Sequence, residues 1–95
     1  MEVVRYGIYE WDPEKEVLNL EKHSVNFTTA LQAFTDPNRL IRVDDTHSFL
    51  EKRWYCMGLV NHQILTVRFT IRGEYIRIFG AGYWRNGRKN YEKKN

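Results

Sequence analysis

The chain has 95 residues, of which 42% are hydrophobic and 28% are charged, a composition that fits one globular domain over residues 1–95 and excludes a disordered chain. With a single cysteine, no signal-peptide layout and no apolar run near the roughly 20 residues of a membrane span, the sequence predicts a cytoplasmic protein without membrane contact. The net charge is +3, but 8 Lys/Arg against 2 Asp/Glu fall in residues 68–95, which marks either a surface for a polyanion or a solvated basic tail.

The first part of the chain predicts one strand followed by two helices. β-Branched and aromatic residues favour a strand from Val3 to Trp11. Asp12-Pro13 is typical of a helix start, and the helix should continue over Lys15–Lys22. Its apolar positions are Val17, Leu18 and Leu20. Thr28 can cap a second helix, which the turn signal Asp36-Pro37-Asn38 ends.

The second part of the chain predicts a run of strands. They cover Leu40–Val43, Trp54–Val60, Ile64–Ile71 and Tyr75–Phe79. The short turns at Asn61-His62-Gln63 and Arg72-Gly73-Glu74 make the last three strands an antiparallel meander. Gly80-Ala81-Gly82 should end the final strand. The segment Arg85–Lys94 is compatible with a short terminal helix, although Asn86-Gly87 disfavours its first turn.

Helices segregated from consecutive strands predict an α+β fold. We expect the two N-terminal helices to pack on one face of a curved antiparallel sheet. The other face is then left free to bind a partner molecule.

A spaced set of residues resembles the BrnT family of toxins. The matching positions are Trp11-Asp12-Pro13, Lys15, Asn19, Lys22-His23, Val25, Phe27, Ala30, Phe34, Asp36-Pro37, Asp45, His47-Ser48, Glu51, Arg53, Gly58, Leu65, Val67, Thr70, Arg72, Arg77-Ile78 and Tyr91-Glu92. The resemblance implies a RelE-like fold and a ribonuclease toxin that inhibits translation, with no cofactor. It also implies a BrnA-type antitoxin that neutralises the toxin, assembles with it and carries the complex to operator DNA.

The chain departs from the family pattern at one position. Where many family members read Ser-Ala-Arg, this sequence reads Gly80-Ala81-Gly82, so an arginine suited to holding the scissile phosphate is replaced by Gly82. Either Arg85 or Arg88 substitutes for it, or the chain cleaves slowly, or it acts only as a binding module in an antitoxin–DNA repressor complex. A nonspecific RNA binder driven by the basic tail is a further alternative.

Metal-independent RNA cleavage needs an acid, a base and positive charge around the phosphate. With the resemblance, Arg53, Arg72 and Arg77 are predicted to clamp the phosphate, because guanidinium groups bind two oxygens at once. His47 and Glu51 are the acid–base candidates, and one helical turn through HSFLE would place them side by side. His47 could instead cap backbone groups in its loop.

Two further possibilities are a metal site and a catalytic role for His23. Asp44, Asp45, His47 and Glu51 could supply metal ligands, but their spacing matches no metal motif, so no metal site is predicted. His23 is expected to complement the dipole of the first helix and not to act in catalysis.

The basic segment near the C-terminus interleaves aromatic and cationic side chains, as single-strand binding surfaces do. The predicted RNA-binding residues are Lys52, Trp84, Arg85, Arg88 and Tyr91. Trp84 and Tyr91 could equally anchor this segment to the core. If residues 51–53 are extended, Lys52 points away from Glu51 and Arg53.

Overall fold

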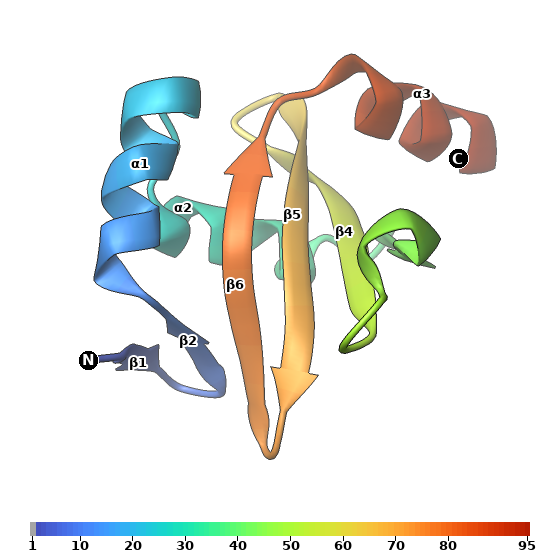
Figure 1. Cartoon of the computed structure of the whole chain (residues 1–95). Coiled ribbons are helices and arrows are strands. Elements are labelled where there is room, and N and C mark those ends of the chain that lie inside the picture. The colour runs from blue at the N-terminus through green and yellow to red at the C-terminus, as the bar shows by residue number, and fades with distance from the viewer. Residues whose placement is uncertain (1) are drawn as a thin grey trace.

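The computed structural model describes residues 2–95, which form a curved six-stranded sheet with three α-helices (Figure 1). In chain order the elements are β1 (Val4–Tyr6), β2 (Tyr9–Trp11), α1 (Pro13–His23), α2 (Phe27–Ala30), the 3-10 helix η1 (Leu31–Thr35), β3 (Leu40–Val43), the 3-10 helix η2 (Asp45–His47), β4 (Arg53–Val60), β5 (Gln63–Arg72), β6 (Tyr75–Gly82) and α3 (Arg85–Lys94). The α+β class predicted from the sequence is confirmed.

The strands lie in the order β1-β2-β6-β5-β4-β3. Every neighbouring pair is antiparallel except β2 and β6, which run parallel and place Glu10 opposite Arg77. The prediction of a wholly antiparallel sheet is therefore wrong at this junction. Only a tight turn forces neighbours to be antiparallel, and the β1–β2 hairpin comes to the edge of β6 from the opposite end of the chain.

Glycines account for two differences from the predicted strands. The segment Val3–Trp11 forms two strands instead of one, because Gly7 has φ +61° and reverses the chain between β1 and β2. The final strand does not break at Gly80 but runs on to Gly82, with residues 80–82 paired to β5. A side chain at Gly80 would lie within 2.6 Å of the Arg68 guanidinium, so the glycine makes room for a neighbour and does not end the strand.

The helix ends follow ordinary capping chemistry. The Asp12 carboxylate accepts a 2.9 Å hydrogen bond from the backbone N–H of Glu14, and Ser24 at φ 58° ends α1. Asn26, not Thr28, caps the second helix, because its side-chain oxygen accepts a 2.8 Å bond from the Thr29 N–H. α2 is only one turn long and continues as η1.

The terminal helix includes the Asn86-Gly87 pair that was expected to exclude its first turn. Gly87 is buried directly against the Thr66 hydroxyl and the Met57 side chain, where a Cβ would not fit. Glycine is therefore selected by packing at this position, which outweighs its low helix propensity. α3 closes a small second core of Leu40, Met57, Ile64 and Tyr91.

The two faces of the sheet are covered unequally. α2 and η1 lie behind the sheet in Figure 1 and bury the main core. Its largest fully buried side chains include Trp11, Phe27, Leu65, Val67 and Ile78. α3 covers one end of the opposite face, and the rest of that face is open. We call it the open face, and it carries the alternating residues Arg53, Arg68, Thr70, Arg72 and Arg77.

The prediction that α1 packs on the covered face together with α2 is wrong. It lies along the part of β6 that extends past β2, where the Asn19 side chain hydrogen bonds to both the N–H and the carbonyl of Ala81 at 3.1 and 2.9 Å. The Asn19 amide thus bonds to the edge of β6 where no further strand pairs with it. The apolar side chains of Val17 and Leu20 on α1 are 55% and 44% exposed. None of the helices within residues 2–95 has the length and apolar content needed to cross a bilayer.

Candidate active site

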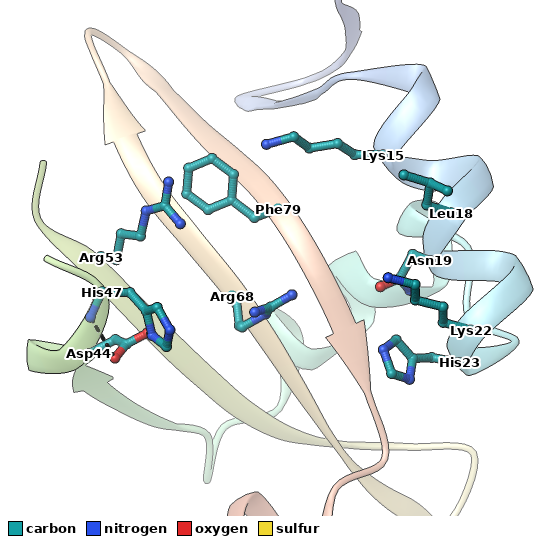
Figure 2. A pocket seen from close by; sticks show the side chains of 10 residues that line it. All are labelled: Lys15, Leu18, Asn19, Lys22, His23, Asp44, His47, Arg53, Arg68 and Phe79. Carbon is teal, nitrogen blue, oxygen red and sulfur yellow. Dashed lines mark hydrogen bonds and ion pairs between the residues drawn. The ribbon is translucent and has the colours of Figure 1, made fainter. Parts of the chain in front are cut away.

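A cavity of about 270 Å³ lies on the open face, between α1 on one side and η2 on the other (Figure 2). It is lined by Lys15, Leu18, Asn19, Lys22, His23, Asp44, His47, Arg53, Arg68 and Phe79. Four Lys/Arg side chains against one carboxylate give the cavity an excess of positive charge, which suits an anionic ligand. Two histidines, one from each wall, add groups that can exchange protons.

The Phe79 ring contacts cationic side chains from three elements, α1, β4 and β5. The guanidinium carbons of Arg53 and Arg72 lie 4.1 and 5.8 Å from the centroid of its ring, and the Lys15 ammonium lies 5.0 Å from it. An aromatic face attracts cations, and each such contact contributes about 0.5–1 kcal/mol at a partly exposed site. Phe79 therefore holds like charges close together, which otherwise repel one another.

Glu51 lies over the same arginines. Its carboxylate accepts two hydrogen bonds from Arg72, at 2.9 and 3.2 Å, and lies 3.8 Å from the Arg53 guanidinium. The bonds from Arg72 lower the pKa of Glu51, with the neighbouring positive charges adding to the effect. Glu51 is thus an ionised group that orients arginines, and it does not line the cavity that holds His47.

The helical turn through HSFLE that would have placed His47 beside Glu51 does not form. The 3-10 turn stops at His47, because the Ser48 hydroxyl accepts a 2.9 Å hydrogen bond from the Arg53 N–H and directs the chain into β4. Lys52 points toward the other side of the sheet, with its ammonium 5.0 Å from the Trp54 ring. His47 and Glu51 are consequently not neighbours on one helical face.

His47 pairs instead with Asp44. The His47 Nδ1 lies 2.8 Å from an Asp44 carboxylate oxygen, and the imidazole extends into the cavity in Figure 2. Burial opposes the ionisation of Asp44, but hydrogen bonds with His47 and Tyr55 outweigh it and lower the pKa of Asp44. Burial, and then the Asp44 carboxylate, raises the pKa of Tyr55. A carboxylate on Nδ1 fixes the imidazole and leaves Nε2 for a substrate proton.

Arg77 lies on the open face but is held in a pair. Its guanidinium donates a 3.0 Å bond to Glu10, and its side chain is only 14% exposed. Glu10 is buried and also accepts a bond from Arg5 at 3.2 Å. Burial alone would raise the pKa of Glu10, but the bonds from Arg77 and Arg5 lower it. Of the three predicted clamp arginines, Arg53 and Arg72 therefore meet at Phe79. Arg77 is instead paired with Glu10 on the neighbouring strand β2.

Arg68 is a site residue that the sequence analysis did not identify. It lies on the floor of the cavity, and its Nε is buried without a hydrogen-bond partner among the described residues. Its guanidinium crosses Gly80 and lies 5.6 Å from the centroid of the Trp84 ring. The period-two spacing of Arg68, Thr70 and Arg72 could have revealed that all three share a face.

His23 also lines the cavity, with its ring edge-on to Trp84 at a centroid distance of 5.1 Å. Lys15 and Lys22 reach the cavity from the same helix. The sequence did single out this side of the cavity, since Lys15, Lys22 and His23 are all among the positions that resemble the BrnT family. What was missing was the placement of α1 beside the open face.

The predicted RNA-binding residues near the C-terminus, Trp84, Arg85, Arg88 and Tyr91, line one groove with Leu59, apart from the cavity. Of these four, Trp84 also contacts the cavity residues Arg68 and His23. The Tyr91 hydroxyl donates a 2.6 Å bond to the buried Asp36 carboxylate, and that bond raises the pKa of Tyr91 to about 12.

Within residues 2–95, no group of three or more His, Cys, Asp or Glu side chains lies close enough together to hold a metal ion. The carboxylates near the cavity are instead engaged by His47 and by arginines.

A small α+β protein with an open, cation-lined sheet face is of a class suited to binding a phosphodiester chain. Residues 11–87 match the family model described as the ribonuclease toxin BrnT of type II toxin–antitoxin systems. The chain therefore belongs to the BrnT family of ribonuclease toxins, and the matched region contains every residue that lines the cavity. Membership implies an antitoxin partner and an RNA substrate. A search of curated protein sequences finds no match to the chain.

Proposed function

We propose that this protein is a metal-independent endoribonuclease and that the cavity between α1 and η2 is its active site. The single observation that supports this best is the set of groups meeting there: four Lys/Arg side chains with a histidine on each opposite wall. Such a set supplies what transesterification of RNA requires, namely charge for the phosphate and two groups for proton transfer.

In the proposed reaction, the ribose 2′-oxygen attacks the adjacent phosphorus while the bond from phosphorus to the 5′-oxygen breaks. The products are a 2′,3′-cyclic phosphate and a 5′-hydroxyl. His47 takes the proton from the 2′-hydroxyl, because Asp44 stabilises the imidazolium that forms. His23, on the opposite wall, donates a proton to the departing 5′-oxygen. No atom beyond those of RNA and these two protons enters the reaction.

The cations have distinct tasks in this proposal. Arg53 and Arg68 bind the non-bridging oxygens of the scissile phosphate, and Lys15 and Lys22 bind the neighbouring backbone. Glu51 and Phe79 hold Arg53 and Arg72 in place. Arg68 takes the role of the family arginine that is absent at Gly82, since it occupies the same face beside Gly80. Arg85 and Arg88 are less suited, because they line another groove.

The biological setting is part of the same proposal. A RelE-like fold, cytoplasmic location, translation inhibition and neutralisation by a BrnA-type antitoxin that binds operator DNA are what family membership supports. The open face is the surface that an antitoxin would have to cover to stop cleavage.

The proposal is tested by incubating the purified protein with a single-stranded RNA in excess chelator and analysing the ends of the products by mass spectrometry. Cleavage that yields a 2′,3′-cyclic phosphate and a 5′-hydroxyl is expected. Products with a 3′-hydroxyl and a 5′-phosphate would overturn the mechanism. A complete absence of cleavage, with antitoxin binding intact, would favour the binding-module alternative.

A further inference from the structure

A second cavity, of about 360 Å³, lies beside the active site, between the first turns of α3 and strands β3 to β5. The side chains of Tyr55, Met57 and Trp84 supply its apolar lining, and Asn86 and Asn90 supply amides. Arg42 contributes a cation. Asn86 and Asn90 are four residues apart on α3, so they share one helix face, and that face borders the cavity.

The polar groups of this cavity are unsatisfied within the part of the chain that the structure describes. Neither side-chain amide, of Asn86 or of Asn90, has a hydrogen-bond partner among residues 2–95. Thr66, which is 4% exposed and also lines the cavity, has a hydroxyl without a partner there. Buried polar groups of folded proteins are nearly always paired, which makes the Thr66 hydroxyl an exception. Asn86 and Asn90 are exposed, so their amides are accessible, and together with Thr66 they suit a ligand with a hydrogen-bonding edge.

The second cavity shares its wall with the active site. Trp84 borders the second cavity, while its ring contacts Arg68 at 5.6 Å and His23 at 5.1 Å, and both of these residues line the first. Asp44 of the first cavity likewise neighbours Tyr55 of the second. A ligand with a phosphate in the first cavity can therefore extend a flat group into the second one.

We propose that the second cavity binds one nucleobase of single-stranded RNA, adjacent to the scissile phosphate, and that it sets the base preference of cleavage. This inference rests on the proposed ribonuclease function. A nucleobase has two apolar faces and a polar edge, which suit aromatic walls and a pair of amides. None of the side chains lining this cavity within the described residues is acidic, so the cavity does not suit a cationic ligand.

The first test uses RNA that cannot be cleaved because a 2′-O-methyl group blocks the attacking oxygen. Placing an abasic nucleotide at one position beside the scissile phosphate should weaken binding to the wild-type protein by roughly tenfold or more, as expected for the loss of one stacked base. The double variant Asn86→Ala/Asn90→Ala should bind normal RNA less tightly and should be insensitive to the abasic nucleotide. The control Gln32→Ala, which removes an exposed amide on the covered side of the sheet, should behave as wild type.

The second test does not depend on catalysis. The four nucleoside 3′-monophosphates, ribose phosphate and inorganic phosphate are titrated while the indole N–H of Trp84 and the amide groups of Asn86 and Asn90 are followed by NMR. Nucleotides should shift these signals, and the two ligands without a base should not.

The outcomes separate the two proposals. If the nucleotides shift these signals but RNA is not cleaved, the base site stands and the nuclease function fails. If RNA is cleaved but the abasic nucleotide and the asparagine variants have no effect, the nuclease function stands and the base site is wrong. Equal shifts with ribose phosphate would also overturn the base site.

Discussion

The guanidinium carbon of Arg53 lies 4.1 Å from the centroid of the Phe79 ring, and the two residues belong to strands that are not neighbours, β4 and β6. Between them, β5 presents the small side chain of Thr70, which is paired with Arg53 on one side and with Arg77 on the other. The arginine thus reaches across a strand to the aromatic ring. Its orientation depends on Phe79 as much as on Glu51.

Replacing this ring should impair catalysis more than stability. Phe79→Leu keeps an apolar side chain but removes the cation–π contacts with Arg53, Arg72 and Lys15, so kcat/KM for RNA should fall about tenfold. The matched control is Tyr75→Leu, because Tyr75 lies on the same strand and holds Arg5 at 4.3 Å outside the cavity. Equal kcat/KM values for the two variants would contradict the role given to Phe79.

The two arginines of the cavity should each be needed for cleavage. Arg53→Ala or Arg68→Ala removes charge that stabilises the pentavalent phosphate, and kcat should fall by about 10²–10³-fold. Arg39→Ala removes the same charge from the opposite side of the sheet, where Arg39 lines a groove with Phe34, and should change kcat less than twofold. Full toxicity of the Arg53 and Arg68 variants in bacteria would refute the site assignment, provided that circular dichroism shows them folded.

The two histidines should each be needed for cleavage, because one accepts a proton and the other donates one. His47→Gln and His23→Gln should each lower kcat by about 10²-fold. His62→Gln, in the turn between β4 and β5, serves as the control and should leave kcat unchanged. An unchanged kcat in the His23 variant would remove His23 from the mechanism.

The buried carboxylate of Glu10 predicts acid sensitivity of the fold. Its pKa is lowered from 4.5 in the folded chain, so its stabilisation is complete above pH 4.5 and is lost as the pH falls through the lower folded value. At pH 7, Glu10→Gln should reduce the free energy of unfolding by about 3 kcal/mol, because Arg77 loses its charged partner. Urea unfolding of both proteins at pH 7 and pH 3 measures this difference, which should shrink at pH 3.

The exposed Glu74, in the turn between β5 and β6, provides the control for that experiment. Glu74→Gln should leave the unfolding free energy unchanged at either pH. If the destabilisation by Glu10→Gln were the same at both pH values, the ionised carboxylate would not be its cause.

Tyr91 separates an anchoring role from a stacking role. Tyr91→Phe keeps the ring but removes the 2.6 Å bond to Asp36, which should lower the free energy of unfolding by about 2 kcal/mol, as expected for a bond to a charged group. RNA cleavage at a temperature where the variant is folded should change less than twofold. Unchanged stability would contradict the anchoring role, and measurements of both quantities on one sample decide between them.

Local patterns in the sequence were sufficient to predict the helices and the meander. Asp12-Pro13 defines the start of α1, and the short turns between the last three strands leave an antiparallel arrangement as the simplest one. The period-two spacing of Tyr75, Arg77 and Phe79 can likewise be read from the sequence and places all three on one face. These features depend on neighbours in the chain, which a sequence displays directly.

The remaining features depend on contacts between distant segments. The partner of Arg77 is Glu10, 67 residues away, and no local pattern links the two. The Asn19 amide that joins α1 to β6 spans 62 residues, and without it Lys15 and His23 could not be placed beside the cavity. Gly82 shows the same difficulty, since its absent side chain is explained only by the Trp84 ring that lies over it.

The parallel pairing of β2 with β6 has a consequence for how the protein is made. β6 is the last strand of the described chain. During synthesis the hairpin of β1 and β2 is therefore made long before β6, the strand with which β2 pairs. Pairings of such long sequence separation form late and slowly. The sheet of a newly made molecule is therefore continuous only after β6 has been translated and has joined the N-terminal hairpin to the meander.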